Sequence, residues 1–215
     1  MSFYSSLLKP NSLCFDVGAN IGEKSEALLR IGMNVVAFEP QKQCAKELMA
    51  RCGHYGEKFV LCESALGASP GEASLHVCEN TAVSSFQKEW NGAATTIQVP
   101  VTTLDHAISR YGTPHFCKID VEGWELEVLK GLTKPIPLLS LEYVLRQRDI
   151  GNTLAALDYL SQFGDLQINI TPAETLSFAF PQSLSLKEFL KLFPTTFQDR
   201  EAYFYGDVFI RTAGR

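Results

Sequence analysis

The sequence predicts an α/β fold, a three-layer sandwich in which helices cover both faces of a mostly parallel sheet of about seven strands. Short apolar segments alternate with segments of helical periodicity along most of the chain, as expected where strands and crossover helices succeed one another. The 215 residues are 46% hydrophobic, enough to bury about 70% of the unfolded surface in one core. No repeat or low-complexity linker divides the chain, so we expect one domain over residues 1–215.

Apolar runs bounded by turn residues predict the strands. In chain order these are 13–17, 35–38, 59–62, 71–78, 96–101, 115–119, 138–144, 166–170 and 203–211. Helical periodicity, Gly32 and Gly53 as stop signals, and a threonine cap at 102 or 103 predict the helices. These are 21–31, 41–51, 102–111, 124–132, 153–163 and 186–193. Strands 71–78 and 96–101 should form a hairpin-like insertion, whose connection 79–94 is expected to be a mobile loop carrying Trp90.

The first two strands end in residues typical of a ligand site. Strand 13–17 contains Asp16 and leads into a loop with Gly18 and Gly22, whereas strand 35–38 is followed by Glu39. In a parallel sheet these ends lie side by side, at the edge where ligands bind. Glycine lets the backbone approach a ligand, and a carboxylate can accept hydrogen bonds from both hydroxyls of a ribose. The pattern predicts a site for a cofactor that contains a nucleoside.

The residues of this loop distinguish between two cofactors. The dinucleotide fingerprint G-x-G-x-x-G, counted from Gly18, requires glycine where this chain has Asn20 and Glu23. Glu23 would repel a pyrophosphate at the start of the helix. S-adenosylmethionine has no phosphate, and the ammonium and sulfonium of its methionine end suit Asp16. We therefore predict S-adenosylmethionine, with a dinucleotide-binding oxidoreductase of similar fold as the alternative.

A second group of acids follows the later strands. Asp120 and Glu122 come after strand 115–119, and Glu142 lies near the end of strand 138–144. Residues two apart in an extended segment point the same way, so Asp120 and Glu122 are expected to face one pocket. All three are candidates for a general base. The alternatives are that Glu122 caps the next helix and that Asp120 pairs with Lys118.

Composition excludes several classes of function. The net charge is −5 and no basic run is present, which argues against binding to a nucleic-acid backbone. The six cysteines form no C-x-x-C pair and have no histidine at metal-ligand spacing. Although Asp120, Glu122 and Glu142 could bind a hard divalent ion, we expect no metal. Without a signal peptide or a long apolar run, a cytoplasmic protein without membrane association is expected.

The motifs together resemble the FkbM family of S-adenosylmethionine-dependent methyltransferases, within the class I, Rossmann-like group. The matching pieces lie at 16–22, 38–40, 65–67, Asn80 with 84–85, and 118–123. The resemblance covers roughly residues 13–142 and implies an antiparallel C-terminal strand. It implies that the cofactor is bound by Asp16, Gly18, Ala19, Asn20, Gly22, Glu39, Pro40, Ser64, Ala65 and Asp120. Within this set, the loop 18–22 would cradle the methionine part, Glu39 the ribose, and Ser64 and Ala65 the adenine.

The resemblance further implies O-methylation of a hydroxyl on a small molecule, such as a sugar or a natural-product scaffold. An alcohol is a poor nucleophile until a base takes its proton, and Asp120 or Glu122 is the expected base. A methyltransferase acting on a protein remains an alternative, as does a cofactor-binding scaffold without activity. The sequence does not determine the oligomeric state.

Overall fold

The computed structural model describes residues 3–78, 84–86, 95–145, 150–173, 175–193 and 205–213. Its main sheet has eight strands in the order β10-β9-β11-β8-β7-β1-β2-β3. The parallel part consists of β1 (Leu13–Val17), β2 (Asn34–Phe38), β3 (Phe59–Cys62), β7 (Phe116–Ile119) and β8 (Leu138–Val144). The antiparallel part adds β9 (Asp165–Pro172), β10 (Leu184–Ser185) and β11 (Tyr205–Ala213), with β11 inserted between β8 and β9.

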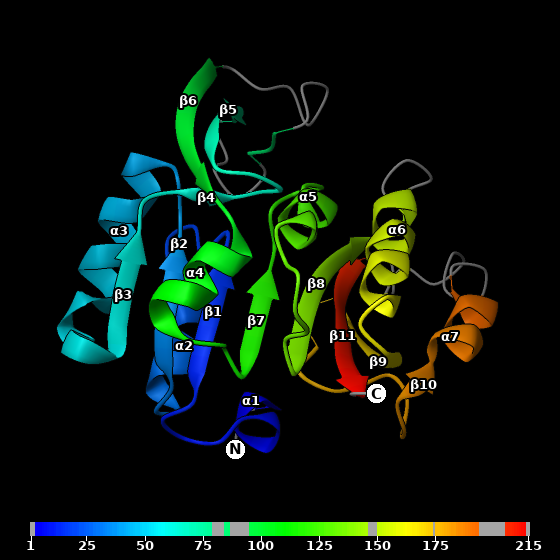
Figure 1. The fold of residues 1–215 in the computed structure, drawn as a ribbon. Helices are drawn as coiled ribbons and strands as arrows, with labels where there is room; N and C mark the ends of the chain where they lie inside the picture. Colours follow the sequence, from blue (N-terminus) through cyan, green and yellow to red (C-terminus); the bar gives the residue numbers. More distant parts are fainter. Residues whose placement is uncertain are drawn as a thin grey trace.

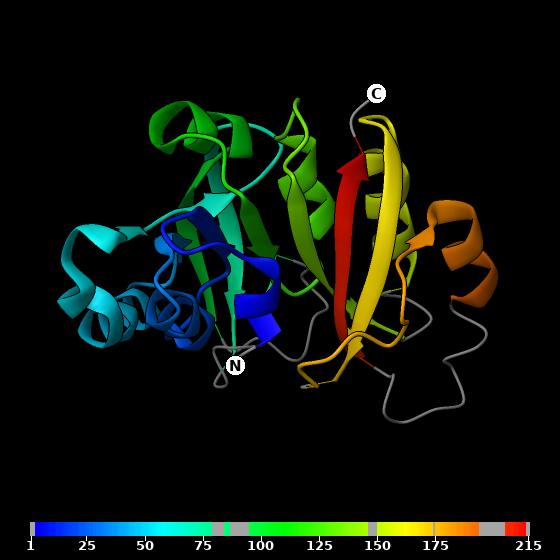
Figure 2. The same ribbon diagram turned by 90° about the horizontal axis from the view of Figure 1, so that it is seen from below.

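Helices cover both faces of this sheet (Figure 1). One face carries α2 (Glu23–Arg30) and α3 (Lys42–Cys52), and the other carries α4 (Leu104–Tyr111), α5 (Glu125–Lys130) and α6 (Ile150–Ser161). Figure 2, seen from below, shows the sheet as the middle layer between them. The short elements α1 (Phe3–Leu7), α7 (Leu186–Leu192) and the 3₁₀ helix η1 (Gly53–Lys58) lie at the margins. The predicted three-layer α/β fold with an antiparallel C-terminal strand is confirmed.

The central strands bury side chains on both faces, which explains their continuous apolar sequences. In β1, Cys14 joins the cluster under α2 and α3, whereas Phe15 and Val17 join the larger cluster under α4, α5 and α6. Because side chains alternate along a strand, Asp16 lies on the same face as Cys14. The first strand thus places a carboxyl group inside an apolar layer.

A second sheet stands above the carboxyl edge of the first (Figure 1). It contains β4 (Ala65–Leu66), β5 (Gly71–Val77) and β6 (Thr95–Thr102), with β5 and β6 antiparallel. The hairpin-like insertion expected from the sequence is confirmed. Of its connection, residues 84–86 are described, and Ser85 forms a β-bridge with His76. Trp90 and the predicted mobile loop around it lie outside the described residues.

The predicted elements occur with shifts of a few residues at their ends. The helix predicted from 102 begins at Leu104 because Thr103 is its cap and accepts a hydrogen bond from the backbone of His106, 3.1 Å away. The helix predicted from Thr153 begins earlier, at Ile150. Helix α1, β4 and β10 are too short for a periodic pattern and were not predicted. Within the described part of the chain, no helix has the length and apolar character needed to cross a membrane.

Candidate cofactor and acceptor site

A pocket opens at the carboxyl edge of β1, β2 and β7, beneath the smaller sheet. The space inside the pocket, including the part that is open to solvent, is about 510 Å³. The lining residues come from segments far apart in the chain and are Val17, Gly18, Asn20, Phe38, Glu39, Pro40, Gln41, Ala65, Leu66, Leu75, Ser84, Phe86, Asp120, Val121 and Glu122. Glu39 from the first group of predicted acids therefore meets Asp120 and Glu122 from the second at one pocket.

Gly18 allows the loop after β1 to pass the end of β7. Its φ is +81°, and a Cβ atom there would lie 1.9 Å from the backbone carbonyl oxygen of Asp120. A side chain would both strain the backbone and collide with a main-chain atom that cannot rotate away. Gly18 therefore allows the loop after β1 to contact the segment that contains Asp120.

Glu39 is held rigidly in the pocket wall. One carboxylate oxygen accepts a hydrogen bond from the backbone N–H of Asn20, and the other accepts one from that of Gln41, both at 2.8 Å. The residue is 3% exposed, and burial raises the pKa of Glu39 to about 7. Because each carboxylate oxygen has two lone pairs, both oxygens can accept a further hydrogen bond from a ligand.

Asp16 lies beneath the pocket and is not part of its lining. It is 1% exposed, and one oxygen accepts a hydrogen bond from Ser25 Oγ at 2.6 Å. The other oxygen is buried and has no hydrogen-bond partner among the described residues. Burial raises the pKa of Asp16, although nearby Lys118 opposes this shift.

The structure divides the predicted cofactor-binding residues into two groups. Gly18, Asn20, Glu39, Pro40, Ala65 and Asp120 line the pocket, whereas Asp16, Ala19, Gly22 and Ser64 do not. Gly22 packs against α3 instead, since a Cβ there would lie 2.4 Å from a methyl carbon of Leu48.

The three acids predicted for catalysis come together. Oxygen atoms of Asp120, Glu122 and Glu142 all lie within 4.8 Å of one another. The prediction that an extended segment points Asp120 and Glu122 the same way was wrong, because the chain is not extended at Glu122. Glu122 has φ +53° and Gly123 has φ +92°. This tight turn directs the Glu122 carboxylate toward Asp120 and Glu142. Three such carboxyl groups could also coordinate a divalent cation, and the expected absence of a metal stays a prediction.

Glu142 has an environment different from that of the other two acids. It lies on β8, and burial together with the charges of Asp120 and Glu122 raises its pKa to about 10. At neutral pH this carboxyl group is therefore protonated and can donate a hydrogen bond.

The buried residue that caps the turn is Glu125, and not Glu122, because Glu125 accepts hydrogen bonds from the backbone of Val121 (3.2 Å) and Gly123 (3.1 Å).

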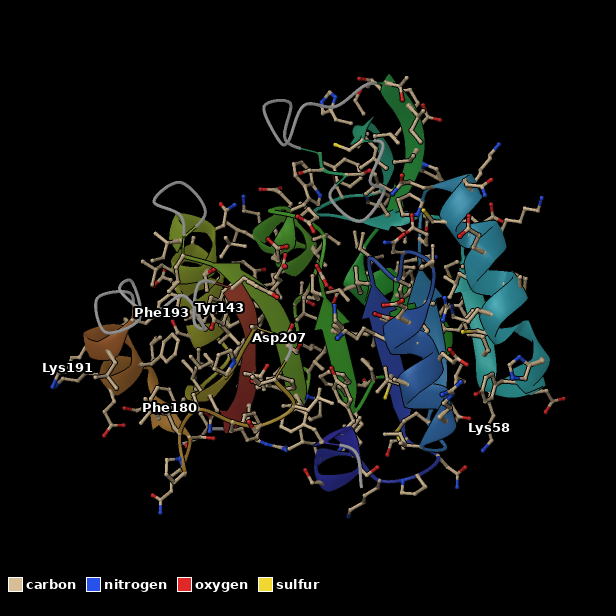
Figure 3. All side chains as sticks on the ribbon, turned by 180° about the vertical axis from the view of Figure 1, so that it is seen from behind. Lys58, Tyr143, Phe180, Lys191, Phe193 and Asp207 are labelled. Atoms are coloured by element: carbon tan, nitrogen blue, oxygen red, sulfur yellow. The ribbon has the colours of Figure 1, made fainter. Side chains whose placement is uncertain are left out.

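Sequence reasoning gave no role to Asp207 and considered Lys118 only as a pairing partner of Asp120, a pairing that the structure shows. Lys118 is 2% exposed, and its ammonium lies 2.5 Å from Asp120. Burial lowers the pKa of Lys118, but the carboxylates of Asp120, Asp207 and Asp16 outweigh this and raise it. Asp207, labelled in Figure 3, lies on β11. In the strand register it is opposite Glu142. The one available signal for it was an acid within an apolar strand pattern, where acids are rare.

The family model of the methyltransferase FkbM domain matches residues 16–164. The chain belongs to this family. The match includes the loop after β1, Glu39 and all three clustered acids, whereas Asp207 lies beyond its end. Of the family-like residues noted at 80 and 84–85, Asn80 lies outside the described residues.

One curated relative of this FkbM domain is the hexuronic acid methyltransferase AglP of Haloferax volcanii. It is 28% identical over 135 residues, which make up 63% of this chain and 55% of AglP. The chain thus aligns with about half the length of that relative.

Solved structures support the fold. The precorrin-6y C5,15-methyltransferase of Geobacter metallireducens aligns over 98% of this chain and 84% of its own, with a TM-score of 0.53 and 10% identity. The fibrillarin pre-rRNA processing protein of Methanococcus jannaschii aligns over 100% of this chain and 70% of its own, also with a TM-score of 0.53 and 10% identity. At such low identity these likenesses establish the Rossmann-like fold alone.

Proposed function

We propose that this FkbM domain is an S-adenosylmethionine-dependent O-methyltransferase that acts on a hydroxyl group of a small molecule. One observation carries the proposal: Glu39 lines the same pocket as Asp120 and Glu122, and these two acids cluster with Glu142. A nucleoside-binding carboxylate and candidate proton acceptors are thereby held in one site. Membership of the FkbM family supports the same activity.

The residues of the pocket fit S-adenosylmethionine better than a dinucleotide. Glu39 is positioned to bind the ribose, and the loop at Gly18 and Asn20 the methionine part. Ala65 and Phe86 would border the adenine. None of the described lining residues is basic, so a pyrophosphate would meet no cation there, and α2 begins with Glu23. The acids among the lining residues, Glu39, Asp120 and Glu122, favour a cationic ligand. When bound, S-adenosylmethionine supplies an electrophilic methyl group.

Glu142 would have a different role from the other two clustered acids. With a pKa of about 10, Glu142 holds its proton at neutral pH and would donate a hydrogen bond to the acceptor oxygen. Asp120 makes a salt bridge with the buried Lys118 ammonium. Asp120 or Glu122, which both line the pocket, would accept the proton of the acceptor hydroxyl as the general base.

The same charges bear on the acceptor. AglP is named for a hexuronic acid, which supports a sugar-like acceptor for this chain. Close to Asp120 and Glu122, however, the carboxylate of a uronic acid would be repelled. A neutral polyhydroxylated acceptor is therefore the form that we propose for the part of the substrate at the acid cluster.

Calorimetric titration with S-adenosylhomocysteine, with NADH as the parallel control, tests the cofactor. We expect binding of S-adenosylhomocysteine and none of NADH, whereas the reverse result would refute the proposal and favour an oxidoreductase. The acceptor class is then tested by measuring S-adenosylhomocysteine release with neutral sugars, matched uronic acids and a peptide mixture. Release with peptides alone would move the function to protein methylation.

A further inference from the structure

We propose that Ser85 is a positioning residue that fixes the Glu122 carboxylate in the acid cluster and ties it to the hairpin above the pocket. The contacts that carry this inference are properties of the fold. Their catalytic meaning rests on the proposed function.

The turn that Ser85 contacts is in an unfavourable conformation. Glu122 has φ +53° and Gly123 has φ +92°. A glutamate pays a steric cost in this left-handed region, so its surroundings must hold it there. Such conformations concentrate at functional sites, and here the conformation directs Glu122 toward Asp120 and Glu142.

Side chains from three different elements hold this turn. Ser85 Oγ donates a hydrogen bond to the carbonyl oxygen of Glu122 at 2.6 Å. Asn152 Nδ2, from α6, donates to the carbonyl oxygen of Gly123 at 3.1 Å. Glu125 accepts from the backbone on either side of Glu122. Of these three, Ser85 alone lies in the hairpin insertion.

Ser85 is itself held in the hairpin. Its backbone N–H donates to the carbonyl of His76 at 3.1 Å, and its carbonyl accepts from the N–H of His76 at 2.9 Å. On either side of Ser85, Ser84 and Phe86 line the pocket, and the Phe86 ring packs against Trp124 with centroids 5.0 Å apart. A ligand that contacts Ser84 or Phe86 thus contacts the segment that positions Glu122.

Removal of the Ser85 hydroxyl tests the inference without any ligand. Ser85→Ala deletes one oxygen and keeps the backbone bridge to His76. Ser74→Ala is the matched control, because Ser74 lies on the same hairpin and its hydroxyl accepts a hydrogen bond from Gln98, away from the turn. We expect amide hydrogen exchange in a peptide spanning residues 118–126 to become about fivefold faster in Ser85→Ala. The Ser74→Ala protein should exchange like the wild type.

A spectroscopic measurement distinguishes a change in the position of the Glu122 carboxylate from a general increase in the mobility of residues 118–126. The titration midpoint of the Glu142 carboxyl group can be followed by ¹³C NMR of its carboxyl carbon, with the signal assigned by Glu142→Gln. This midpoint depends on Asp120, Glu122, Glu125 and Lys118, which act on Glu142. If Ser85 positions Glu122, the Glu142 midpoint falls in Ser85→Ala and is unchanged in Ser74→Ala. An unchanged midpoint and unchanged exchange in Ser85→Ala would overturn the inference. Because no cofactor is added, these results stand even if S-adenosylhomocysteine fails to bind.

Discussion

The ammonium of Lys118 lies 2.5 Å from a carboxylate oxygen of Asp120, and only 3% of the lysine side chain is exposed. In the strand register Lys118 is also the direct neighbour of Asp16. One buried cation therefore lies between the acid of the first strand and the acid at the mouth of the pocket. Charges so placed stabilise one another only as a set, since each alone is costly to bury.

Replacement of this cation should destabilise the fold. Lys118→Met keeps most of the side-chain volume but removes the buried cation that acts on Asp120, Asp207 and Asp16. We expect the free energy of unfolding to fall by about 3 kcal/mol, measured by urea denaturation. Lys58→Met, at an exposed position, should change it by less than about 0.5 kcal/mol. Equal effects of the two substitutions would contradict the role given to Lys118.

Asp120→Asn should impair methyl transfer far more than cofactor binding. If Asp120 is the base, kcat should fall by about 10²-fold or more, with affinity for S-adenosylhomocysteine reduced only slightly. Asp158→Asn, on α6, is the control and should retain activity. If Asp120→Asn is fully active and Glu122→Gln is not, the role of base passes to Glu122.

Glu39→Gln should weaken the binding of S-adenosylhomocysteine by about tenfold or more, because hydrogen bonds to a charged acceptor are lost or weakened. The substitution keeps the size of the side chain, so thermal unfolding should show a folded protein. Isothermal titration of Glu57→Gln, at an exposed position on η1, provides the reference. Wild-type affinity in Glu39→Gln would remove Glu39 from the ribose site.

Gly18→Ala distinguishes collision from backbone strain. Gly18 and Gly32 have similar φ values, +81° and +86°, but a Cβ at Gly32 would meet only Pro10, at an ordinary 3.7 Å. Gly32→Ala should therefore cost only the strain of the left-handed conformation, about 1–2 kcal/mol. Gly18→Ala adds the collision with the Asp120 carbonyl and should cost clearly more in urea denaturation. If the two variants are equally stable, the loop after β1 can move away from β7.

Glu142 should make the fold less stable at high pH. Its pKa is about 10 in the folded protein, above the ordinary 4.5, so the folded state binds more protons than the unfolded state between these values. Stability from this group therefore falls as the pH rises through that window. Glu142→Gln should match the wild type near pH 4 and exceed its stability at pH 9. Denaturation curves of both proteins at the two pH values provide the measurement. If the difference in the free energy of unfolding between Glu142→Gln and the wild type is the same at pH 4 and pH 9, the raised pKa of Glu142 is contradicted.

Much of the fold could be predicted because the central strands are buried on both faces. The predicted central strands 13–17 and 138–144 have the observed ends, since runs of mostly apolar residues define them. The edge strand 59–62 also has the predicted ends. The meeting of Glu39 with Asp120 was also predictable, because the carboxyl ends of parallel strands share one edge. The expectations of one domain and of a cytoplasmic protein stay predictions.

The parts that could not be predicted depend on contacts between distant segments. No local pattern indicates that Glu122 takes a left-handed conformation, because Ser85, Asn152 and Glu125 together hold it there. Asp207 reaches the site only through the insertion of β11 between β8 and β9.

That insertion has a practical consequence for anyone who expresses part of this chain. The family match ends at residue 164, yet residues 205–211 pair with the whole length of β8. A fragment cut at the family boundary would leave β8 as a bare edge strand, with unpaired backbone groups along a buried apolar sequence. Such edges recruit other strands and lead to aggregation. The smallest fragment that remains monodisperse should therefore extend past Arg211, well beyond the limit that family similarity alone suggests.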